Sequence, residues 1–558
     1  MPGPLLERVL AARGLADPAA AERFLSPTLA QLHDPSSIPD LDRAADRLLG
    51  AVRRGERIAI YGDYDVDGST ASAILYHTLS QLGASPESIE CYVPHRVDEG
   101  YGLHTPAIEE LASRGAAVIV SVDCGVTAIE PARAARSLGI DLIITDHHTP
   151  PASLDDLPDA FAVVHPARPD SRYPFAGLCG AGVAFKLAWR LATLDAGGDK
   201  ASPAMRSLLL ELLALVALGT IADVVPLIDE NRAMTRAGLD RLRNTGNPGL
   251  NALIEASGLA GEKLSCDDVG FRLAPRLNAC GRLGHARETV ELLTTAAGTR
   301  AAELAAMLSG LNDRRRAIER RITDRACEIA LAAGMCEDTS RAIVAADQGW
   351  HPGVVGIACS RLVDRFCRPT ILLCREGDTL RGSARSVDGF NLHDALAACA
   401  EHLTSFGGHD MAAGLALDAS RLEAFTEAFA DHARRALADH PLVPTTRYDS
   451  DASLNELTPT LVERLERLAP FGRANPGVVL RLDGLPVQSL KPFGRDGSHL
   501  NIVVGPASRP LRLVAWGFAE HAGSVRPGQR IDALVRPKTS TWSGNTRVEP
   551  ELLDFRVR

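Results

Sequence analysis

Short, continuous apolar runs separated by stretches of helical spacing constrain the fold of this chain more than any other feature of its sequence. In the first 170 residues such runs occur at 58–61, 90–94, 117–122, 141–145 and 162–164. Helical stretches lie between them, around 69–82, 105–114 and 128–138. Runs that are apolar throughout indicate strands buried on both faces. The pattern therefore predicts an α/β domain whose parallel sheet is covered by helices on both sides.

Three of these runs end in polar clusters. The first is followed by an acidic turn with Asp63, Asp65 and Asp67, the third by Asp123, and the fourth by Asp146-His147-His148. In a parallel sheet the ligand site lies beyond the carboxyl ends of the strands, so we expect these clusters to meet there. Close carboxylates repel one another unless a cation neutralises them, and carboxylates together with imidazole suit manganese, magnesium or zinc-like ions. The sequence therefore predicts a metal site at this edge of the sheet.

A calcium loop is the first alternative for the acidic turn, because Asp-x-Asp-x-Asp-Gly opens the loop of an EF-hand. Such a loop requires a preceding helix and a glutamate at its twelfth position. Counting from Asp63, the twelfth residue is Ile74, and the preceding run at 58–61 is β-prone. Calcium buffering is therefore disfavoured. A solvated acidic turn remains the second alternative, although the other two clusters weaken it.

Composition narrows the class of protein further. A length of 558 residues predicts three or four domains, and 46% hydrophobic with 23% charged residues is typical of a soluble globular protein. The eleven cysteines never form Cys-x-x-Cys, which argues against a zinc site and fits reduced thiols in a cytoplasm. The net charge of −10 weakly disfavours a nucleic-acid partner, although a whole-chain value can hide basic patches.

The N-terminus and the most apolar segment both argue against a membrane or secretory protein. Glu7, Arg8 and Arg13 interrupt the N-terminus before an apolar core forms. The segment 208–222 contains Glu211 and is shorter than a bilayer-spanning helix requires. We therefore expect a cytoplasmic chain that has no membrane partner.

The second half of the chain changes character twice. Residues 301–330 space their apolar side chains as a helix does, and a helix of about 35 residues would span about 50 Å. Its polar face carries arginines, which fits either a solvated surface or a nucleic-acid contact. Strands and helices alternate again from about residue 340. After Pro441, short alternating runs with Gly and Pro breaks predict a small β-barrel.

Several motifs resemble a known family, the DHH phosphoesterases. "YGDYDVDGS", "SVDCG" and "TDHH" look like its first three motifs, and "LGTIADVVPL" supplies the fourth with Asp223. "PHRVDEGYGL" and "APRLNACGRLGHA" are typical of the single-strand-specific exonucleases within the family. The adjustable positions Val66 and Cys280 do not correspond to ligands.

The resemblance implies a two-cation centre with Mn²⁺ or Mg²⁺. Its ligands would be Asp63, Asp65, Asp67, Asp123, His147 and Asp223, with Asp123 bridging both ions. Which of the three aspartates in the acidic turn bind directly stays open, because a turn need not keep the alternation of a strand. The catalytic pair would be His148 and Asp146. His148 would face the scissile phosphate, and Asp146 would orient His147 by accepting a hydrogen bond from it.

The resemblance also implies where nucleic acid binds. A DHH-associated domain carries the Gly407-Gly408-His409 motif, whose glycines let a phosphate approach the backbone. Arg96, Arg276, Ser383 and Arg385, with Asn278 and Arg282, would hold the 5′-terminal phosphate or the nearby backbone. The barrel would be an OB-fold, in which Phe493, Trp516 and Trp542 either stack on bases or pack in the core.

These observations together predict five regions and one leading function. The regions are an N-terminal helical lead (1–40), a DHH catalytic domain (41–230), a helical region with a long connecting helix (231–339), a second α/β domain, the DHH-associated domain (340–440), and an all-β OB-fold (441–558). The resemblance implies a metal-dependent 5′-to-3′ exonuclease that hydrolyses single-stranded DNA to 5′-mononucleotides in recombination and repair. Expected partners are single-stranded DNA, a helicase and a single-strand-binding protein.

Two other functions remain as alternatives. A DHH-type phosphodiesterase acting on short oligoribonucleotides, cyclic dinucleotides or pyrophosphate would not need the C-terminal barrel. A catalytically inactive single-strand-binding protein would be expected to have lost an acidic ligand, and every acidic motif is present.

Overall fold

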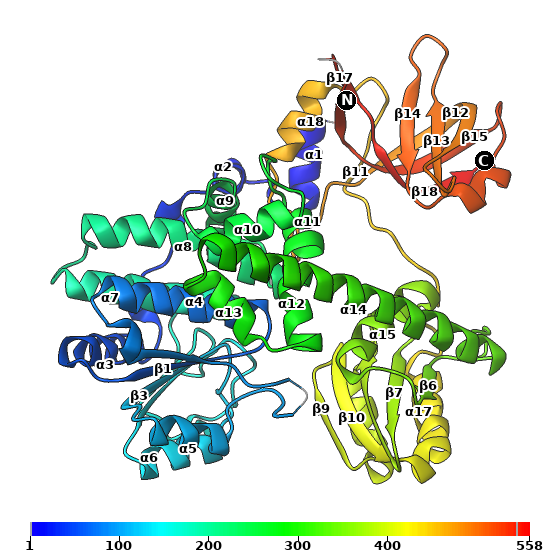
Figure 1. Ribbon diagram of the computed structural model, residues 1–558. Coiled ribbons are helices and arrows are strands. Elements are labelled where there is room, and N and C mark those ends of the chain that lie inside the picture. The colour runs from blue at the N-terminus through cyan, green and yellow to red at the C-terminus, as the bar shows by residue number, and fades with distance from the viewer. Residues whose placement is uncertain (1–2, 97, 543–544) are drawn as a thin grey trace. The chain divides into compact units, whose positions relative to one another are not determined.

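The computed structural model describes residues 3–96, 98–542 and 545–558 (Figure 1). These residues form two compact units. The large unit consists of residues 34–223 and 240–444, and the small unit of residues 1–33, 224–239 and 445–558.

The first sheet of the large unit has five parallel strands in the order β2-β1-β3-β4-β5. They are β1 (Ile58–Gly62), β2 (Ile89–Tyr92), β3 (Val118–Val122), β4 (Asp141–Thr145) and β5 (Ala162–Val164). Helices α5 (Thr105–Ser113) and α6 (Ile129–Ser137) pack on one face, and α3 (Leu41–Arg54), α4 (Val66–Gln81) and α7 (Gly180–Asp195) cover the other (Figure 1). The predicted doubly covered parallel sheet is confirmed.

Helix α8 (Pro203–Ala222) is the apolar segment noted in the sequence, and it is longer than we expected. The helix has 20 residues, and an 18-residue window within it has a mean hydropathy of 1.8, which is enough in length and composition to cross a membrane, so the expectation that it is too short was wrong. It packs against α4 and α7, and 61% of its apolar window is buried inside the protein. Burial in this core explains its composition without a membrane.

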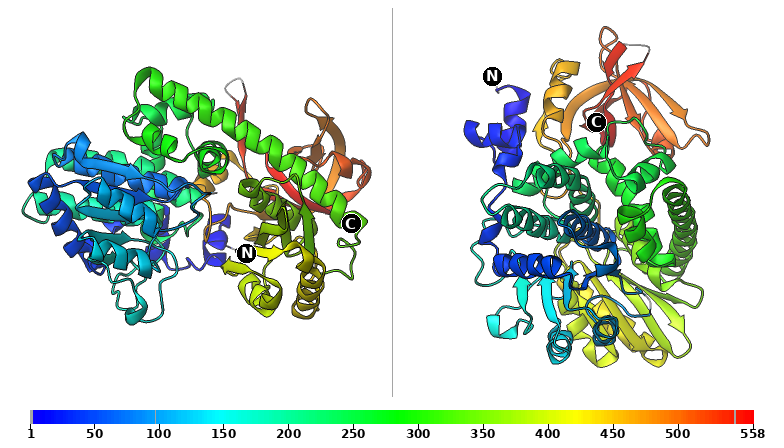
Figure 2. Two further views of the ribbon diagram at one scale, coloured as in Figure 1. Left: turned by 60° about the horizontal axis from the view of Figure 1, so that its bottom comes forward. Right: turned by 60° about the vertical axis from the view of Figure 1, so that its left-hand side comes forward.

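A helical region follows, with α9 (Asp229–Leu242), α10 (Pro248–Ala256), α11 (Cys266–Asp268), a π-helical turn (Val269–Leu273), α12 (Ala274–Leu283) and α13 (Arg287–Thr294). Helix α14 (Gly298–Ala332) is the predicted long helix, with 35 residues spanning about 52 Å. It runs unbroken in both views of Figure 2 (green). It packs against α10, α12 and α15 (Pro352–Phe366).

The second sheet of the large unit is mixed, with the order β6-β7-β8-β10-β9. Its strands are β6 (Ile343–Asp347), β7 (Thr370–Glu376), β8 (Thr379–Arg385), β9 (Ser405–Gly408) and β10 (Ala412–Asp418). One face packs on α16 (Leu392–Ala398) and α17 (Leu422–Ala436), and the other face packs partly on α15. This is the second α/β domain that the sequence predicted.

The small unit contains the predicted barrel. Its sheet runs β11-β12-β13-β14-β18-β15 and closes through a β12–β15 pairing. The strands are β11 (Ser450–Asp451), β12 (Leu480–Phe493), β13 (His499–Val504), β14 (Leu511–Ala515), β15 (Arg530–Arg536) and β18 (Glu551–Val557), with a separate hairpin of β16 (Thr539–Trp542) and β17 (Asn545–Val548). The side chain of Trp542 lies outside the described part of the chain.

The N-terminal lead belongs to the core of the barrel. Leucines of α1 (Leu5–Ala12) and α2 (Pro18–Leu25) lie in one apolar cluster with α18 (Pro459–Glu466) and the strands of the barrel. Helix α9 contributes Arg232, whose side chain is 2% exposed and whose guanidinium lies 3.8 Å over the ring of Phe24. It donates hydrogen bonds to the carbonyl oxygens of Phe24, Arg467, Leu468, Ala469 and Pro470. This guanidinium therefore ties three distant segments together.

Candidate active site

The acidic turn after β1 divides its three aspartates between a loop and a helix. Asp65 caps α4, because its carboxylate accepts a hydrogen bond from the backbone N–H of Gly68 at 3.1 Å. Asp67 lies in the first turn of α4 and is 1% exposed. Its carboxylate accepts hydrogen bonds from the N–H groups of Gly180 and Ala181 at 2.6 and 2.8 Å, at the start of α7. The turn thus does not keep strand alternation, and Asp67 is held by a helix N-terminus.

Asp123 follows β3 in an unusual backbone conformation. Its φ is 64°, in the left-handed region that few residues other than glycine adopt. The backbone N–H donates to the carbonyl of Thr145 at 3.0 Å, and the residue is 2% exposed. Strain of this kind persists where the surrounding structure requires it, and here it turns a carboxylate towards the ends of β1 and β4.

Asp146 holds His148, and this corrects the expectation that it would orient His147. Its Oδ1 accepts hydrogen bonds from the backbone N–H groups of His147 and His148, at 2.7 and 3.1 Å. The same oxygen lies 2.8 Å from Nδ1 of His148. Because the carboxylate of Asp146 accepts hydrogen bonds from the backbone of the two residues that follow it, it lies close to the side chain of the second one, His148. Burial raises the pKa of Asp146, but the hydrogen bond and charge of His148 outweigh it and lower this pKa to about 2.

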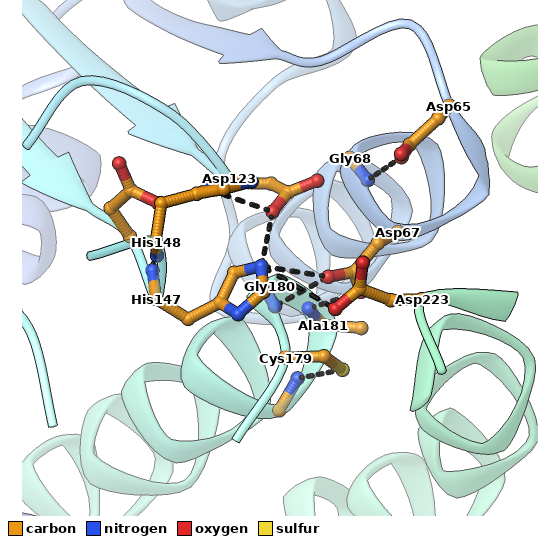
Figure 3. A network of polar contacts seen from close by, with 12 residues as sticks. Asp65, Asp67, Gly68, Asp123, His147, His148, Cys179, Gly180, Ala181 and Asp223 are labelled. Atoms are coloured by element: carbon orange, nitrogen blue, oxygen red, sulfur yellow. Dashed lines mark hydrogen bonds and ion pairs between the residues drawn. The ribbon is translucent and has the colours of Figure 1, made fainter. Parts of the chain in front are cut away.

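The imidazole of His147 is surrounded by carboxylates (Figure 3). Its Nε2 lies 3.0 Å from Asp123 Oδ1, 3.6 Å from Asp223 Oδ2 and 3.7 Å from Asp67 Oδ2. Asp223 reaches this position from the end of α8. The side chains that the sequence motifs singled out therefore meet, although they come from four different elements.

The donor atoms of this cluster suit cations. Asp63 Oδ1, Asp123 Oδ1 and His147 Nε2 are buried and make no hydrogen bond among the described residues, although the last two atoms lie 3.0 Å apart. Leaving such atoms unpaired is costly unless a ligand binds them. Three groups have donor atoms within 4.8 Å of one another: Asp63, Asp65 and Asp123; Asp67, His147 and Asp223; and Asp123, His147 and His148. Asp123 occurs in two of the three groups, as the predicted bridging ligand would.

The electrostatics of the cluster also favour bound cations. Burial and the charges of Asp67, Asp65, Asp63 and Asp223 raise the pKa of Asp123 well above its usual value. Burial and the charge of Asp65 do the same for Asp63. Both shifts mean that the positive charges of the protein alone do not balance the negative charges of the ionised carboxylates. A divalent cation supplies the missing positive charge, so cation binding is expected to weaken as the pH falls.

Tyr101 is a site residue that the motif analysis missed. Its hydroxyl donates to the backbone carbonyl of Asp123 at 3.2 Å and lies 3.0 Å from Nδ1 of His148. Its ring packs edge-on against the His148 ring, with centroids 5.3 Å apart. Gly100 and Gly102 flank it with φ values of 88° and 97°. The sequence Gly-Tyr-Gly could have indicated this residue, because a turn with glycines on both sides exposes its central side chain.

Three of the predicted phosphate-binding arginines lie within electrostatic reach of one another. Burial and the charges of Arg96, Arg315 and Arg385 lower the pKa of Arg282 to about 9. Burial and the charge of Arg96 lower the pKa of Arg385. A Cβ added to Gly356 of α15 would lie 3.2 Å from both Ser383 Oγ and an Arg385 nitrogen, so these two tips converge over that helix. We call Arg96, Arg282, Ser383 and Arg385 the arginine group. Its mutual repulsion favours binding of an anion.

The remaining phosphate-binding candidates have other surroundings. Arg276 donates to the carbonyl of Arg272 at 2.6 Å and to Ser309 Oγ of α14 at 3.2 Å. Asn278 accepts a hydrogen bond from the backbone N–H of Val66 at 3.2 Å, which fixes the start of α4.

The glycine motif lies on the second sheet. Gly407 is on β9, where it pairs with Gly414, and Gly414 pairs in turn with Ser383. Gly408 has a φ of 140°, and His409 begins the turn to β10 with its N–H donating to the carbonyl of Ala412 at 2.8 Å. The roles of these residues stay predictions.

Replacing Gly180 with alanine is expected to lower activity by about 100-fold without unfolding the protein. The added Cβ would lie 2.6 Å from Asp123 Cβ and 2.8 Å from Asp123 Oδ1, so Asp123 must move. A displacement of this size at a positioned group costs about 10²-fold. Turnover and melting temperature check the prediction. Gly198→Ala is the control, because its Cβ would meet nothing within 4 Å. Parental turnover by Gly180→Ala would show that the position of Asp123 does not matter.

Comparison with known proteins agrees with this geometry. Family models match as the DHH family, N-terminal domain, over residues 57–220, the DHHA1 domain over 339–435 and the RecJ OB domain over 448–554. The sheet, the acidic cluster and these matches define a phosphoesterase of the DHH class.

Individual relatives narrow the DHH class to one family. The single-stranded-DNA-specific exonuclease RecJ of Bacillus subtilis (strain 168) is 38% identical over 552 residues, which are 99% of this chain and 67% of that protein. A crystal structure of RecJ in complex with Mn²⁺ from Thermus thermophilus has a TM-score of 0.82 at 31% identity and covers 98% of this chain and 75% of that one. A complex with Mg²⁺ from the same source has a TM-score of 0.76 at 30% identity, covering 98% and 74%. This chain belongs to the RecJ family, which confirms the resemblance read from its motifs.

Proposed function

We propose that this protein is an exonuclease that hydrolyses single-stranded DNA from its 5′ end and releases 5′-mononucleotides with the help of two divalent cations, Mn²⁺ or Mg²⁺. The observation that carries the proposal is the meeting of the acidic cluster with His147 and His148 beside the arginine group. The charge of Arg96 acts on both Asp63 and Asp65, so a phosphate held by this arginine lies near the acidic cluster.

The side chains of the cluster divide the work of holding the cations. Asp63 and Asp65 would hold one ion, Asp67, His147 and Asp223 the other, and Asp123 both. Such a pair, when bound, lowers the pKa of a water molecule and clamps the phosphate. Asp146 fixes the ring of His148 through Nδ1, and Tyr101 contacts the same edge. His148 is 33% exposed at its side chain, which leaves it facing the open side of the site, where a phosphate would lie.

The arginine group would capture the 5′-terminal phosphate. Guanidinium groups donate paired hydrogen bonds to phosphate oxygens, and Ser383 adds a hydroxyl donor. Binding an anion offsets both the burial and the neighbouring positive charges that lower the pKa of Arg282 and Arg385. A terminal phosphate bound here would fix the distance between the 5′ end of the strand and the cations. That distance would determine the direction of degradation and the length of the product.

The small unit would bind the strand through exposed aromatic rings. Trp516 is 53% exposed, and its ring lies 4.8 Å from that of His499 and 5.4 Å from that of Phe493. Rings of this kind stack on bases without regard to sequence. We propose in addition that a helicase supplies the single strand, that a single-strand-binding protein works on it, and that the enzyme acts in recombination and repair in the cytoplasm. The eleven free cysteines fit that compartment.

Replacing Trp516 with alanine is expected to weaken single-strand binding by about tenfold, because one stacked base contributes about 1–3 kcal/mol. Fluorescence anisotropy with labelled oligonucleotides measures the affinity. Tyr448→Ala is the matched control, since Tyr448 is also exposed, at 42%, but lies outside the aromatic cluster. Unchanged affinity in Trp516→Ala would refute the role of these rings.

The function itself is tested with oligonucleotides labelled at either end, single-stranded and duplex. We expect a 5′ label to leave as a mononucleotide in the earliest products, a 3′ label to persist on a shortening strand, and duplexes to resist. Manganese should support the reaction and a chelator should stop it. Early loss of the 3′ label, or equal hydrolysis of duplex, would contradict the proposal.

A further inference from the structure

One member of the arginine group lies near the acidic cluster without pairing with it. Arg96 forms no hydrogen bond and no ion pair within the part of the chain that the structure describes. Its charge nevertheless lowers the pKa of Asp63 and Asp65, against the larger effects of burial and of neighbouring carboxylates. Opposite charges attract strongly at short range inside a protein. A feature of the structure must therefore keep this guanidinium away from the two carboxylates.

The ring of Tyr64 provides such a feature. Tyr64 lies between Asp63 and Asp65 in the sequence, and the Cζ atom of Arg96 lies 4.6 Å from the centroid of its ring. At this distance the face of an aromatic ring attracts a cation without neutralising it. Burial and the charge of Asp63 raise the pKa of Tyr64 to about 12, and the charges of Arg96 and Arg282 oppose that rise. The side chain is thus within electrostatic reach of both the acidic cluster and the arginine group.

Helix α12 holds the backbone around Tyr64 in place. A Cβ added to Gly281 would lie 2.6 Å from the carbonyl oxygen of Tyr64 and 3.6 Å from its Cβ, so the helix can approach this closely only with glycine there. One turn earlier in the helix, Asn278 Oδ1 accepts a hydrogen bond from the N–H of Val66 at 3.2 Å. The ring therefore extends from a backbone that two contacts fix, as a positioning role requires.

The loop that carries Arg96 is held by contacts that do not involve the Arg96 side chain. The N–H of His95 donates to Glu99 Oε1 at 2.6 Å, and the hydroxyl of Tyr92 donates to the other oxygen of that carboxylate at 2.7 Å. The ring centroids of His95 and His285 lie 4.8 Å apart. The backbone is thus anchored at the residue before Arg96, and the place of the guanidinium depends on the side chain that it meets.

We propose that Tyr64 is a positioning residue that holds the guanidinium of Arg96 on its ring and so keeps it from pairing with Asp63 and Asp65. The inference rests on the proposed function, in which Arg96 binds the 5′-terminal phosphate and the two aspartates hold a cation. A guanidinium paired with these aspartates would compete with the cation and would be lost to the phosphate. Stacked on the ring, it keeps its charge and its N–H donors, so both sites stay available.

The test is a double-mutant cycle of Tyr64 and Arg96, in which calorimetry measures Mn²⁺ binding to the full-length protein without DNA. Tyr64→Leu should weaken Mn²⁺ binding by about tenfold, because Arg96 then pairs with the carboxylates. Arg96→Ala should leave it within about threefold of the parental value, since the stacked guanidinium acts on the cation only at a distance. The double variant should bind Mn²⁺ as Arg96→Ala does. A tyrosine with a purely structural role would weaken binding equally with and without Arg96.

Kinetics with 5′-phosphorylated single strands at saturating Mn²⁺ give a second readout. Tyr64→Leu should raise KM by about tenfold and change kcat less, because the arginine that binds the terminal phosphate is no longer held in place. Tyr64→Phe should match the parental protein in both assays, because it keeps the ring. Tyr76→Leu is the control, since it makes the same replacement in α4, where no arginine stacks on the tyrosine among the described residues.

Three results would overturn the proposal: parental Mn²⁺ affinity in Tyr64→Leu, equal weakening with and without Arg96, or a Tyr64→Phe variant that behaves as Tyr64→Leu does. Melting temperatures show whether Tyr64→Leu folds. If it does not, Arg96→Ala decides, because Mn²⁺ binding tightened by about tenfold would mean that the guanidinium already competes with the cation. Failure of the parental protein to hydrolyse single strands would instead overturn the proposed function, and the titrations without DNA would still report on Tyr64.

Discussion

Replacing Asp123 with asparagine is expected to lower the rate of single-strand hydrolysis by about 10³-fold or more, while single-strand binding stays within about twofold. Asp123 belongs to two of the three ligand groups, so one substitution weakens both cation positions. An amide keeps the size of the carboxylate but supplies no charge. Because the arginine group and the aromatic rings do not involve Asp123, the strand still binds.

The same variant separates a catalytic role from a structural one. In the absence of metal, the ionised Asp123 is buried among like charges, which raise its pKa. Asparagine removes that repulsion, so the metal-free variant should melt at or above the parental temperature. Calorimetric titration with Mn²⁺ should show weaker binding. Asp338→Asn is the control, since Asp338 is exposed. Parental turnover by Asp123→Asn would show that the acidic cluster is not the catalytic site.

Replacing Arg232 with alanine is expected to destabilise the small unit by about 3 kcal/mol or more. The buried guanidinium donates to five backbone carbonyls that belong to two segments of the chain, and its plane stacks on Phe24. Removing it takes the donor from the carbonyls of Phe24, Arg467 and Ala469 and opens a cavity against Phe24, while the carbonyls of Leu468 and Pro470 keep a hydrogen bond from Asn475 Nδ2. Urea unfolding followed by intrinsic fluorescence measures the loss. Arg23→Ala is the matched control, because Arg23 is exposed on α2. Equal stability of the two variants would contradict the prediction.

The sequence predicted the sheet and the meeting of the acidic clusters because both follow from local rules. Runs apolar throughout become parallel strands, and residues after such strands share one edge. The particular hydrogen bonds could not be predicted in this way. Asp146 holds His148, and not His147, because of how its loop turns. Asp67 is separated from Asp65 because helix α4 begins between them and α7 supplies N–H donors from more than 100 residues away.

Long-range packing was the other feature that local patterns did not reveal. The hydrogen bonds of Arg276 with Ser309 and of Asn278 with Val66 are such contacts, and the phosphate-binding roles of both residues stay predictions. We predicted the N-terminal lead as a separate region because nothing in its local sequence indicates that it packs against the C-terminal barrel. Tyr101 was missed since motif comparison directed attention to acidic and imidazole side chains alone.

The shared core of the first and last segments has a consequence for synthesis of the chain. Leu5, Leu6, Val9 and Leu10 are packed among residues between 457 and 552, so they leave the ribosome long before their neighbours exist. Contacts this distant along a polypeptide form slowly. We expect the large unit to mature first, and the nascent N-terminal helices to need protection by a chaperone until translation is complete.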